Sequence, residues 1–515
     1  MHIDLQESSA SEVFQSTVCV IGGGIAGLTL AMRLAHKGIV VHVLEAGGFS
    51  PEERSQALYR ADMKSETHLG ANEGRHRIFG GSSTRWGGQL LPFTADIFAP
   101  PPGSPSLPWP IQESDLEPFY ADVQNIAGVD SLPFTADLLP AVGHAGAPVS
   151  PDVTLRFSKW IPFKRRNLAG TLGAEALAHR LVTVFTHANA AQLEASPDDL
   201  GRIGSVRVLN YNSREFRFSA THFVVCAGTI ESSRLLLCSP DVPNSHDQIG
   251  RYFHDHVSYH AARFLGPGRE RAIDLFGPFY VEGTMHSAKL EASPALRAQE
   301  NLHTVMAHVV VLEPEDSGVA AIRNLLRSLQ RRKLKQAMVA NLIPVLRGAG
   351  DVARLWFYSR FKKRRAVSQR ATLMLNIDVE QAPHSDNRIS LSATETDGLG
   401  LPRTVLDWRV RAPELDTAVR YVPIVRDYLS AAGMDTLEWE HGTPAMVDTY
   451  HMMGGLRMGT DPASSVVDTD LKVYGLSNLH IASCAVFPSG SSSNPTFTMM
   501  ALTLRLADQL AEKCR

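Results

Sequence analysis

Apolar residues mark the first structural unit of the chain. Residues 18–21 are apolar throughout, as in a buried strand, and after a glycine-rich turn the apolar positions recur at helical spacing. A second apolar run, residues 39–44, ends at Glu45. The order strand, turn, helix, strand predicts a βαβ unit, which is the building block of a parallel sheet in an α/β domain.

Further along the chain the pattern alternates. Residues 182–195 and 205–218 read as short strands, and the apolar run 223–226 breaks at Ala227 and enters a helical pattern. Five longer alternating runs follow: residues 257–266, 303–312, 371–381, 387–393 and 403–410. We predict that these five form one antiparallel sheet in a second domain. Residues 417–433 fit a helix stopped by Gly433.

Residues 320–370 form a basic insertion in this alternating region. From residue 323 to residue 370 Asp351 is the only acidic residue, and apolar residues such as Leu325 and Leu329 recur at helical spacing. This predicts a pair of amphipathic basic helices. Such helices can lie on an anionic membrane, cover an active site, form a subunit contact, or simply be solvated on one face.

Composition narrows the class of protein. With 515 residues, 44% hydrophobic and 20% charged, the chain is long enough for two or three domains, and a net charge of -3 gives no field suited to nucleic acid. The five cysteines show no C-x-x-C spacing, and neither a secretory signal nor an apolar run of about 18 residues is visible. We therefore expect a cytoplasmic protein with reduced thiols.

The turn after the first strand carries the spacing G-x-G-x-x-G. Gly22 permits the turn, Gly24 lets a pyrophosphate approach the backbone, and Gly27 lets helix and strand pack closely. Glu45, at the end of the next strand, is placed to accept hydrogen bonds from a ribose. The motif predicts a dinucleotide site and leaves the choice between NAD(P) and FAD open.

A second glycine-rich loop, "GGSSTRWGG", surrounds Trp86. Glycines on both sides of one aromatic residue suggest a backbone that approaches something flat and bulky, although loop geometry alone also explains them.

The C-terminal segment resembles the end of the glucose-methanol-choline (GMC) oxidoreductases. Similar motifs run along most of the chain in the family's order, among them "YHMMGGLRMG", "SSNPT", "GGSSTRWGG", "VVCAGTIESSRLLL" and "GRYFHDH". The resemblance implies FAD as the cofactor and a mixed α/β fold, with a Rossmann-like FAD-binding domain and a substrate domain on an antiparallel sheet. Within the family, the sequence is most similar to the bacterial sugar-oxidising branch, which includes pyranose oxidase-like, glycoside 3-oxidase and aminosugar oxidase enzymes.

The resemblance also implies domain boundaries. The FAD-binding domain is expected to combine residues 14–95, 180–256 and 465–515, with residues 96–179 as a connecting or lid segment. The substrate domain is expected at residues 257–464.

Site residues are carried over position by position. Alcohol oxidation removes a hydroxyl proton and a hydride, so it needs a base, and histidine is largely neutral near pH 7. His451 matches the family's base and Asn494 its partner beside the substrate hydroxyl. The residues expected at the cofactor are Gly22, Gly24, Gly27, Glu45, Gly81, Ser82, Trp86, Gly87, Gly88, Ala190, Ala227, Ser483, Asn494, Pro495 and Thr496. From residue 495 onward a helix is expected to direct its N-terminus at the flavin.

Three positions depart from the family or invite another interpretation. Arg85 stands where some relatives attach the flavin to a histidine, so non-covalent FAD is expected. Ser483 stands where an acid is common. His254 is an addition before Asp255-His256, but no further metal ligands can be nominated, so no metal is expected.

The leading hypothesis is an FAD-dependent oxidoreductase that converts a CH–OH group of a sugar, glycoside or aminosugar to a ketone or aldehyde. Oxygen, a quinone or another acceptor would take the electrons. The alternatives are a non-redox FAD-containing lyase, a membrane-associated quinone-linked dehydrogenase of a non-sugar alcohol, and a cofactor-binding protein without turnover. The sequence does not name the sugar, the carbon oxidised, the acceptor, the oligomeric state or the role of residues 320–370.

Overall fold

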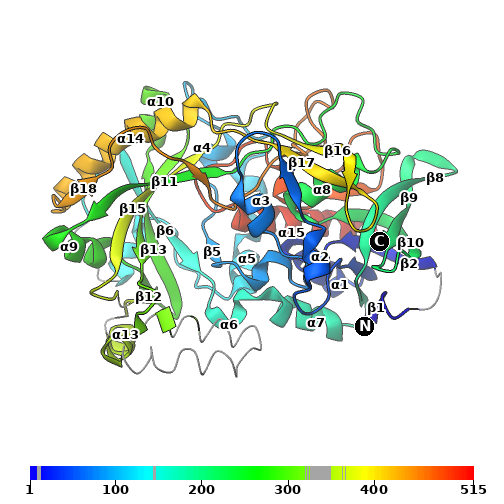
Figure 1. Ribbon diagram of the computed structural model, residues 1–515, viewed down its shortest axis with the longest axis horizontal. Helices are drawn as coiled ribbons and strands as arrows, with labels where there is room; N and C mark the ends of the chain where they lie inside the picture. Colours follow the sequence, from blue (N-terminus) through cyan, green and yellow to red (C-terminus); the bar gives the residue numbers. More distant parts are fainter. Residues whose placement is uncertain are drawn as a thin grey trace.

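Two large sheets lie side by side in the computed structural model, with helices packed around them (Figure 1). The structure describes residues 1–8, 13–142, 147–318, 320, 321, 324, 349–361, 363–365 and 367–514. Most of the predicted basic insertion falls outside these residues. The described helices are α1 (Ile25–His36), α2 (Glu53–Ala57), α3 (Leu69–Glu73), α4 (Ala95–Phe98), α5 (Tyr120–Ala127), α6 (Phe163–Arg166), α7 (Leu172–Ala178), α8 (Gly228–Leu237), α9 (Gly266–Phe276), α10 (Pro294–Glu300), α13 (Ala349–Phe361), α14 (Ala412–Ala431) and α15 (Thr496–Lys513).

The first sheet contains the predicted βαβ unit. Its order is β1-β7-β3-β2-β10-β9-β8, with β20 also paired to β10. Its strands are β1 (His2–Asp4), β2 (Val13–Ile21), β3 (Val41–Leu44), β7 (Val182–Thr186), β8 (Asn189–Ser196), β9 (Asp199–Leu209), β10 (Glu215–Val225) and β20 (Leu479–Ile481). Strands β1, β7, β3, β2, β10 and β20 pair in parallel, whereas β9 and β8 are antiparallel. The mixed α/β class predicted from the sequence is confirmed.

The second sheet is antiparallel and has the order β18-β11-β15-β14-β13-β6-β5, with β12 on β13 and β19 on β11. Its strands are β5 (Gln89–Leu90), β6 (Val153–Trp160), β11 (His256–Phe264), β12 (Phe279–Val281), β13 (Thr284–Ala292), β14 (Val305–Leu312), β15 (Thr372–Glu380), β18 (Leu437–Trp439) and β19 (Val447–Asp448). Strand β6 lies in the segment that we expected to be a connection, and β12 and β13 were not predicted. The domain boundaries themselves stay a prediction.

The single five-stranded sheet predicted between residues 257 and 410 was wrong in one respect. Strands β16 (Arg388–Thr396) and β17 (Pro402–Asp407) pair with each other outside the large sheet, and β17 also pairs with β4 (Ala61–Met63) to form a three-stranded sheet. Alternation predicted the strands correctly but carries no information about which sheet they join, because pairing depends on partners far away in the chain.

Each face of the second sheet has its own character. One face packs against α14, where Ala418, Tyr421, Val425 and Leu429 are buried in a hydrophobic cluster with the sheet. The opposite face carries polar residues such as His256 and Asp378. A polar face is unusual for a sheet interior and indicates a surface that meets a ligand rather than a helix.

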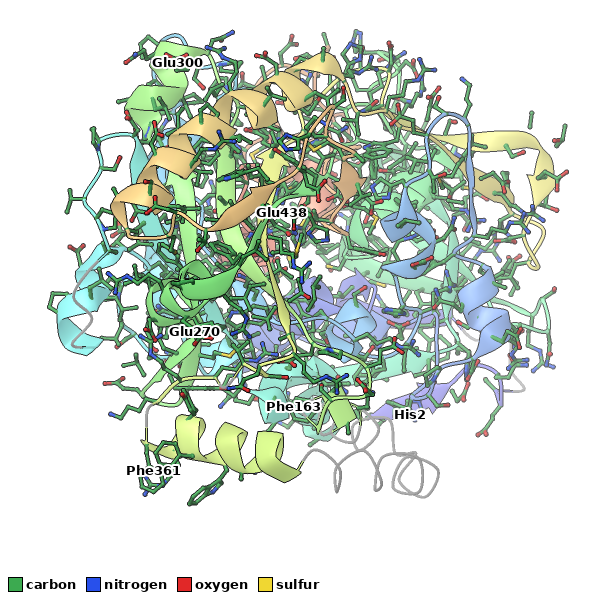
Figure 2. The ribbon with its side chains drawn as sticks, turned by 60° about the vertical axis from the view of Figure 1, so that its left-hand side comes forward. His2, Phe163, Glu270, Glu300, Phe361 and Glu438 are labelled. Carbon is green, nitrogen blue, oxygen red and sulfur yellow. The ribbon has the colours of Figure 1, made fainter. Side chains whose placement is uncertain are left out.

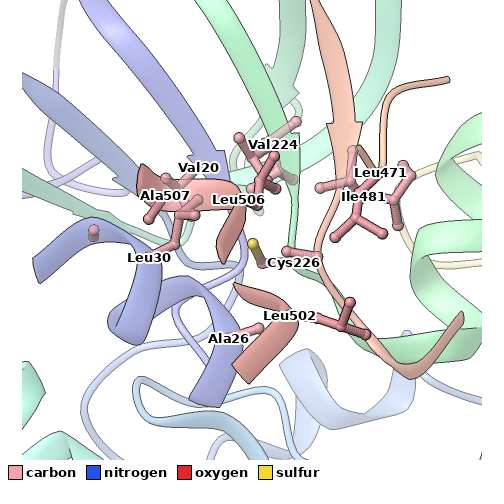
Figure 3. Packing of buried hydrophobic residues seen from close by; sticks show 14 of the residues in the cluster. Val20, Ala26, Leu30, Val224, Cys226, Leu471, Ile481, Leu502, Leu506 and Ala507 are labelled. Atoms are coloured by element: carbon pink, nitrogen blue, oxygen red, sulfur yellow. The ribbon is translucent and has the colours of Figure 1, made fainter. Parts of the chain in front are cut away.

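The C-terminal helix α15 closes the core of the first sheet. Its residues Leu502, Leu506 and Ala507 pack beside Val20 and the α1 residues Ala26 and Leu30 (Figure 3). Burying a leucine side chain contributes roughly 2 kcal/mol. The two ends of the chain therefore build one core.

Helix α13 is the described part of the basic insertion and lies outside both sheets. Trp356 and Phe361 on this helix are 63% and 60% exposed, and Figure 2 shows Phe361 pointing away from the rest of the chain. Among the described helices none is both long and apolar enough to cross a membrane.

Candidate active site

The first glycine-rich turn uses its three glycines in different ways. Gly22 has φ +115°, and a Cβ there would lie 2.6 Å from the carbonyl oxygen of Cys226. A Cβ on Gly27 would lie 1.8 Å from the carbonyl oxygen of Gly22. By contrast, the nearest atom to a Cβ on Gly24 is the Cα of Gly81, at 3.9 Å. Gly22 and Gly27 therefore permit packing, whereas Gly24 leaves the backbone open to a ligand.

Two clefts meet beside this turn. The larger has about 1040 Å³ of empty space and the smaller about 680 Å³. The residues that line both clefts are Gly22, Glu45, Tyr59 and Ala227. Two adjoining clefts of this size, the larger of which is lined by the N-terminus of α1, suit an elongated dinucleotide.

Glu45 stands where the two clefts join. Its carboxylate accepts hydrogen bonds from the backbone N–H groups of Gly23 at 3.0 Å and Gly47 at 2.8 Å, and burial raises its pKa. A carboxylate has about four acceptor positions, so these two bonds leave capacity for ribose hydroxyls. Ala190, also expected at the cofactor, lines the smaller cleft.

A buried group of charged residues, missed by sequence reasoning, lines the smaller cleft. Arg234 contacts Asp397 at 2.6 Å, and Arg75, which lines the larger cleft, contacts Glu231 at 2.9 Å. The guanidinium of Arg77 lies 4.9 Å from the ring centre of Tyr59. The two partners of each ion pair are far apart in the sequence, so no local pattern predicted the pairs.

The side chains of His451 and Asn494 are in contact. The Nδ2 atom of Asn494 lies 3.0 Å from Nε2 of His451. His451 lines the larger cleft together with Ser483, Pro495 and Thr496. Asn494 Oδ1 is buried and has no hydrogen-bond partner in the part of the chain that the structure describes. The pair thus offers one basic nitrogen and one unused acceptor at the same place.

A hydrogen-bond chain fixes the tautomer of His451. Thr449 Oγ1 donates to Asp255 Oδ1 at 3.1 Å, because a carboxylate can only accept. The hydroxyl oxygen is then free to accept from His451 Nδ1, which lies 2.9 Å away. His256 Nδ1 lies 3.1 Å from His451 Nδ1. With its hydrogen on Nδ1, His451 keeps Nε2 unprotonated toward Asn494.

Asp255 holds this arrangement in place through further hydrogen bonds. Its Oδ1 atom also accepts the backbone N–H groups of His256 at 2.7 Å and His451 at 2.9 Å, while Oδ2 lies 3.2 Å from Nε2 of His68. Burial alone would raise the pKa of Asp255, but His68 and the nearby histidines hold it below its usual value. Sequence analysis located Asp255-His256 in a family turn without assigning either residue a role.

His68, Asp255 and Asp448 offer atoms within 4.8 Å of one another. Backbone N–H groups already occupy two members of the cluster, since Asp448 accepts from Leu69 and Gly70 at 2.7 and 2.8 Å and His68 Nδ1 accepts from Ala71 at 3.1 Å. We therefore assign no ion to this cluster. His254 does not join it, because its Nδ1 lies 2.8 Å from the carbonyl oxygen of Tyr252.

The electrostatics favour a neutral imidazole. Burial lowers the pKa of His451, and the negative charges of Asp255 and Asp378 only partly oppose this. Burial, reinforced by the charge of His451, lowers the pKa of His256 to about 4. Both rings are neutral near pH 7, so His451 can accept a proton.

The N-terminus of α15 faces the larger cleft. Pro495 caps the helix, no side chain caps its first N–H groups, and Thr496 and Met499 line the space. These N–H groups present a positive partial charge to whatever occupies this end. Ser483 accepts the backbone N–H of Ala485 at 3.3 Å, which is a local structural role.

One part of the Trp86 loop lines the larger cleft, and the other part packs against the rest of the protein. Gly81 and Ser82 line the larger cleft. Trp86 Nε1 donates to the carbonyl oxygen of Arg166 at 2.7 Å, and a Cβ on Gly87 would lie 3.1 Å from Trp160. Trp86, Gly87 and Gly88 are absent from the described lining of the two clefts.

These features fit a flavin dinucleotide. The open backbone at Gly24 and the helix N-terminus suit a pyrophosphate, Glu45 suits a ribose, and the uncapped start of α15 beside His451 suits a ring system that gains negative charge on reduction.

Comparisons with known proteins point the same way. A family model described as GMC oxidoreductase matches residues 383–503, and one described as NAD(P)-binding Rossmann-like domain matches residues 20–72. The 6'''-hydroxyparomomycin C oxidase of Streptomyces lividus is 25% identical over 98% of this chain and 93% of its own length. The fructose dehydrogenase large subunit of Gluconobacter japonicus is 21% identical over 97% of this chain and 98% of its own length.

Among solved structures, pyridoxine 4-oxidase from Mesorbium loti shares the fold. The TM-score is 0.59 at 16% identity, with 96% of this chain and 99% of that chain covered.

Proposed function

We propose that the chain is a GMC oxidoreductase and that it oxidises a CH–OH group of a sugar or glycoside to a ketone or aldehyde. Its cofactor is FAD. The observation that carries the proposal is the contact of His451 Nε2 with Asn494 Nδ2 beside the cleft that the fingerprint glycines line.

The protein's own groups account for the proton half of the reaction. The substrate hydroxyl displaces the Asn494 amide from His451 Nε2 and donates its hydrogen to that nitrogen, while Asn494 holds the same oxygen. As Nε2 takes the proton, Asp255 stabilises the imidazolium through Thr449. When bound, FAD supplies the acceptor for the hydride from the carbinol carbon.

Sugar-class substrates are supported by two kinds of observation. The relatives that align over nearly the whole chain are named for hydroxyparomomycin C and for fructose. The polar face of the second sheet, on which His256 lies, gives a hydrogen-bonding wall next to His451. A multiply hydroxylated substrate matches such a wall, whereas a small apolar alcohol would leave its groups unpaired.

We further propose that FAD is held without a covalent bond. Arg85 stands where the resemblance would place an attaching histidine. Burial raises the pKa of Cys484, which lines the larger cleft, to about 12, so that this thiol is not a nucleophile at neutral pH. Release of all the yellow colour into the supernatant on acid precipitation is expected.

An anaerobic flavin-reduction screen tests the function. Purified enzyme is mixed with neutral sugars, glycosides, aminosugars and simple alcohols, and bleaching of the oxidised flavin is followed. We expect bleaching by at least one sugar-class compound and not by simple alcohols at the same concentration. Bleaching by simple alcohols alone would refute the sugar assignment, and no bleaching by any donor would favour the lyase alternative. Admission of air, and separately of a quinone, then identifies the electron acceptor.

Cytoplasmic location and a membrane or subunit contact through residues 320–370 stay predictions.

A further inference from the structure

Lys289 is a buried cation without a partner. It lies in the middle of β13 and is 3% exposed, yet its ammonium makes no hydrogen bond or ion pair with any described residue. Burial lowers its pKa to about 8. An ammonium on a side chain this deeply buried is normally paired, so an unpaired one in a sheet interior is available to a ligand.

The two acidic residues whose charges act on Lys289, Glu291 and Asp378, contact other residues. Glu291 forms an ion pair with Arg156 at 3.1 Å. Asp378, on β15, lies 3.3 Å from Nδ1 of His308 and accepts from Ser258. Neither acid lies within 4.0 Å of the Lys289 nitrogen, although their negative charges act on it.

The sheet register places Lys289 on the polar face. His308 on β14 is opposite Asn376 on β15, and the next strand brings Lys289 level with His308, because Leu290 pairs with Ala307. Directly paired residues of antiparallel strands point to the same side, so these side chains share one face.

His256, which contacts the catalytic His451, lies on this same face. Ser258 pairs with Asp378, and His256, two residues before Ser258, contacts His451 at 3.1 Å. The charge of Lys289 reaches His451: burial is the largest cause of the lowered pKa of His451, Asp378 opposes the shift and Lys289 adds to it. Lys289 and Asp378 therefore share the sheet face on which His256 contacts His451, and the charges of both act on His451.

Resting on the proposed function, we infer that Lys289 and Asp378 form the sugar-recognition pair of this site. The Lys289 ammonium donates to hydroxyl or ring oxygens of the substrate, and Asp378 accepts from a substrate hydroxyl. A separated cation and anion on one wall suit a neutral molecule that carries both donors and acceptors. A substrate ammonium is repelled by Lys289, and a substrate carboxylate is repelled by Asp378. The site thus selects neutral sugars over aminosugars and uronic acids.

The test uses the FAD-loaded enzyme and its Lys289→Met and Lys289→Gln variants. Anaerobic stopped-flow gives the dissociation constant and limiting rate of flavin reduction for a neutral glycoside, the matching aminosugar and the matching uronic acid. Lys472→Gln, at a lysine whose side chain is 38% exposed, is the control. Thermal unfolding of each variant is measured in parallel.

Loss of a charge-assisted hydrogen bond is expected to weaken neutral-glycoside binding by roughly 10- to 100-fold in Lys289→Met. The limiting rate should change far less, and the ratio of aminosugar to neutral-glycoside affinity should rise. Lys289→Gln, which can still donate, should recover part of the neutral binding. Both variants should melt no lower than the native enzyme, because an unpaired buried charge is removed.

Unchanged affinities and ranking in Lys289→Met, with sugars still reducing the native flavin, would overturn this inference and leave the proposed function standing. A lower melting temperature with unchanged ranking would assign Lys289 a structural role and overturn it as well. Failure of every sugar to reduce the native flavin would overturn both.

Discussion

Asp255 Oδ1 accepts a hydrogen bond from the backbone N–H of His451 at 2.9 Å. The same oxygen accepts from Thr449, whose hydroxyl oxygen contacts His451 Nδ1 at 2.9 Å. One carboxylate oxygen thus fixes both the position of the His451 backbone and the tautomer of its ring. Its negative charge also favours the protonated ring that forms during the reaction.

Asp255→Asn removes this charge, and its amide can donate an N–H to the Thr449 hydroxyl. Thr449 would then donate to His451 Nδ1 instead of accepting from it, and the ring would carry its hydrogen on Nε2. We expect flavin reduction to slow by roughly 10- to 100-fold. Because Asp255 raises the pKa of His451 against the larger effect of burial, its loss should move the acid limb of the rate profile to lower pH. Stopped-flow reduction between pH 5 and pH 8 measures both effects. An unchanged acid limb would show that the charge does not act on His451.

His451→Ala removes the base. We expect flavin reduction by the best sugar to slow by at least about a hundredfold, and the acid limb of its pH profile to disappear. FAD content should stay at the native level, since the fingerprint glycines are untouched. A rate within a few fold of the native enzyme would show that another group takes the proton.

Gly24→Ala and Gly27→Ala form a matched pair. The nearest atom to a Cβ on Gly24 is 3.9 Å away, so Gly24→Ala should fold and melt like the cofactor-free native protein but bind FAD at least tenfold more weakly. A Cβ on Gly27 would lie 1.8 Å from Gly22, so Gly27→Ala should fail to accumulate as soluble protein. Thermal melts of the cofactor-free proteins and FAD titration separate the two. Native FAD affinity in Gly24→Ala would exclude the proposed phosphate approach.

Acid sensitivity should depend on His480. This side chain is 1% exposed, neither ring nitrogen has a partner among the described residues, and burial lowers its pKa to about 3. The unfolded chain, with a histidine pKa near 6.5, binds the proton first, so stability is full above about pH 6.5 and falls as the pH drops toward 3. At pH 5 the loss amounts to roughly 2 kcal/mol.

His480→Leu should therefore melt at the native temperature or higher at pH 5, with a smaller difference at pH 8. His246→Leu, at an exposed histidine, is the control and should keep the native pH dependence. An equal pH dependence of the melting temperature in His480→Leu and the native protein would contradict the prediction.

The parts of the site that could be predicted from the sequence are those formed by residues close together in the chain or by motifs in a known order. Strand, turn and helix around Gly22, Gly24 and Gly27 follow from periodicity and sterics, and the His451–Asn494 contact follows from motif order. Asp255, Thr449 and His68 were assigned no role, because their function is to position another residue. That role exists only once β11, β19 and α3 meet.

The strands show the same limit. Alternation correctly predicted the residues of β16 and β17 as extended, but the pairing of β17 with β4 depends on residues more than 300 positions away. Lys289 illustrates the point for function. In sequence it is one lysine in an unpredicted strand, and only the register of β13, β14 and β15 places it near His451.

The packing of α15 against α1 has a consequence for biosynthesis. Helix α15 belongs to the same core as α1 and the fingerprint turn, yet it is translated long after them. Until α15 has emerged from the ribosome, the apolar surface of α1 and of the parallel sheet that α15 covers stays exposed in the nascent chain. Exposed surface of this kind binds chaperones and promotes aggregation. Ribosome-stalled chains that lack residues 496–513 should therefore stay protease-sensitive in the first sheet, and FAD loading should require that α15 has been synthesised.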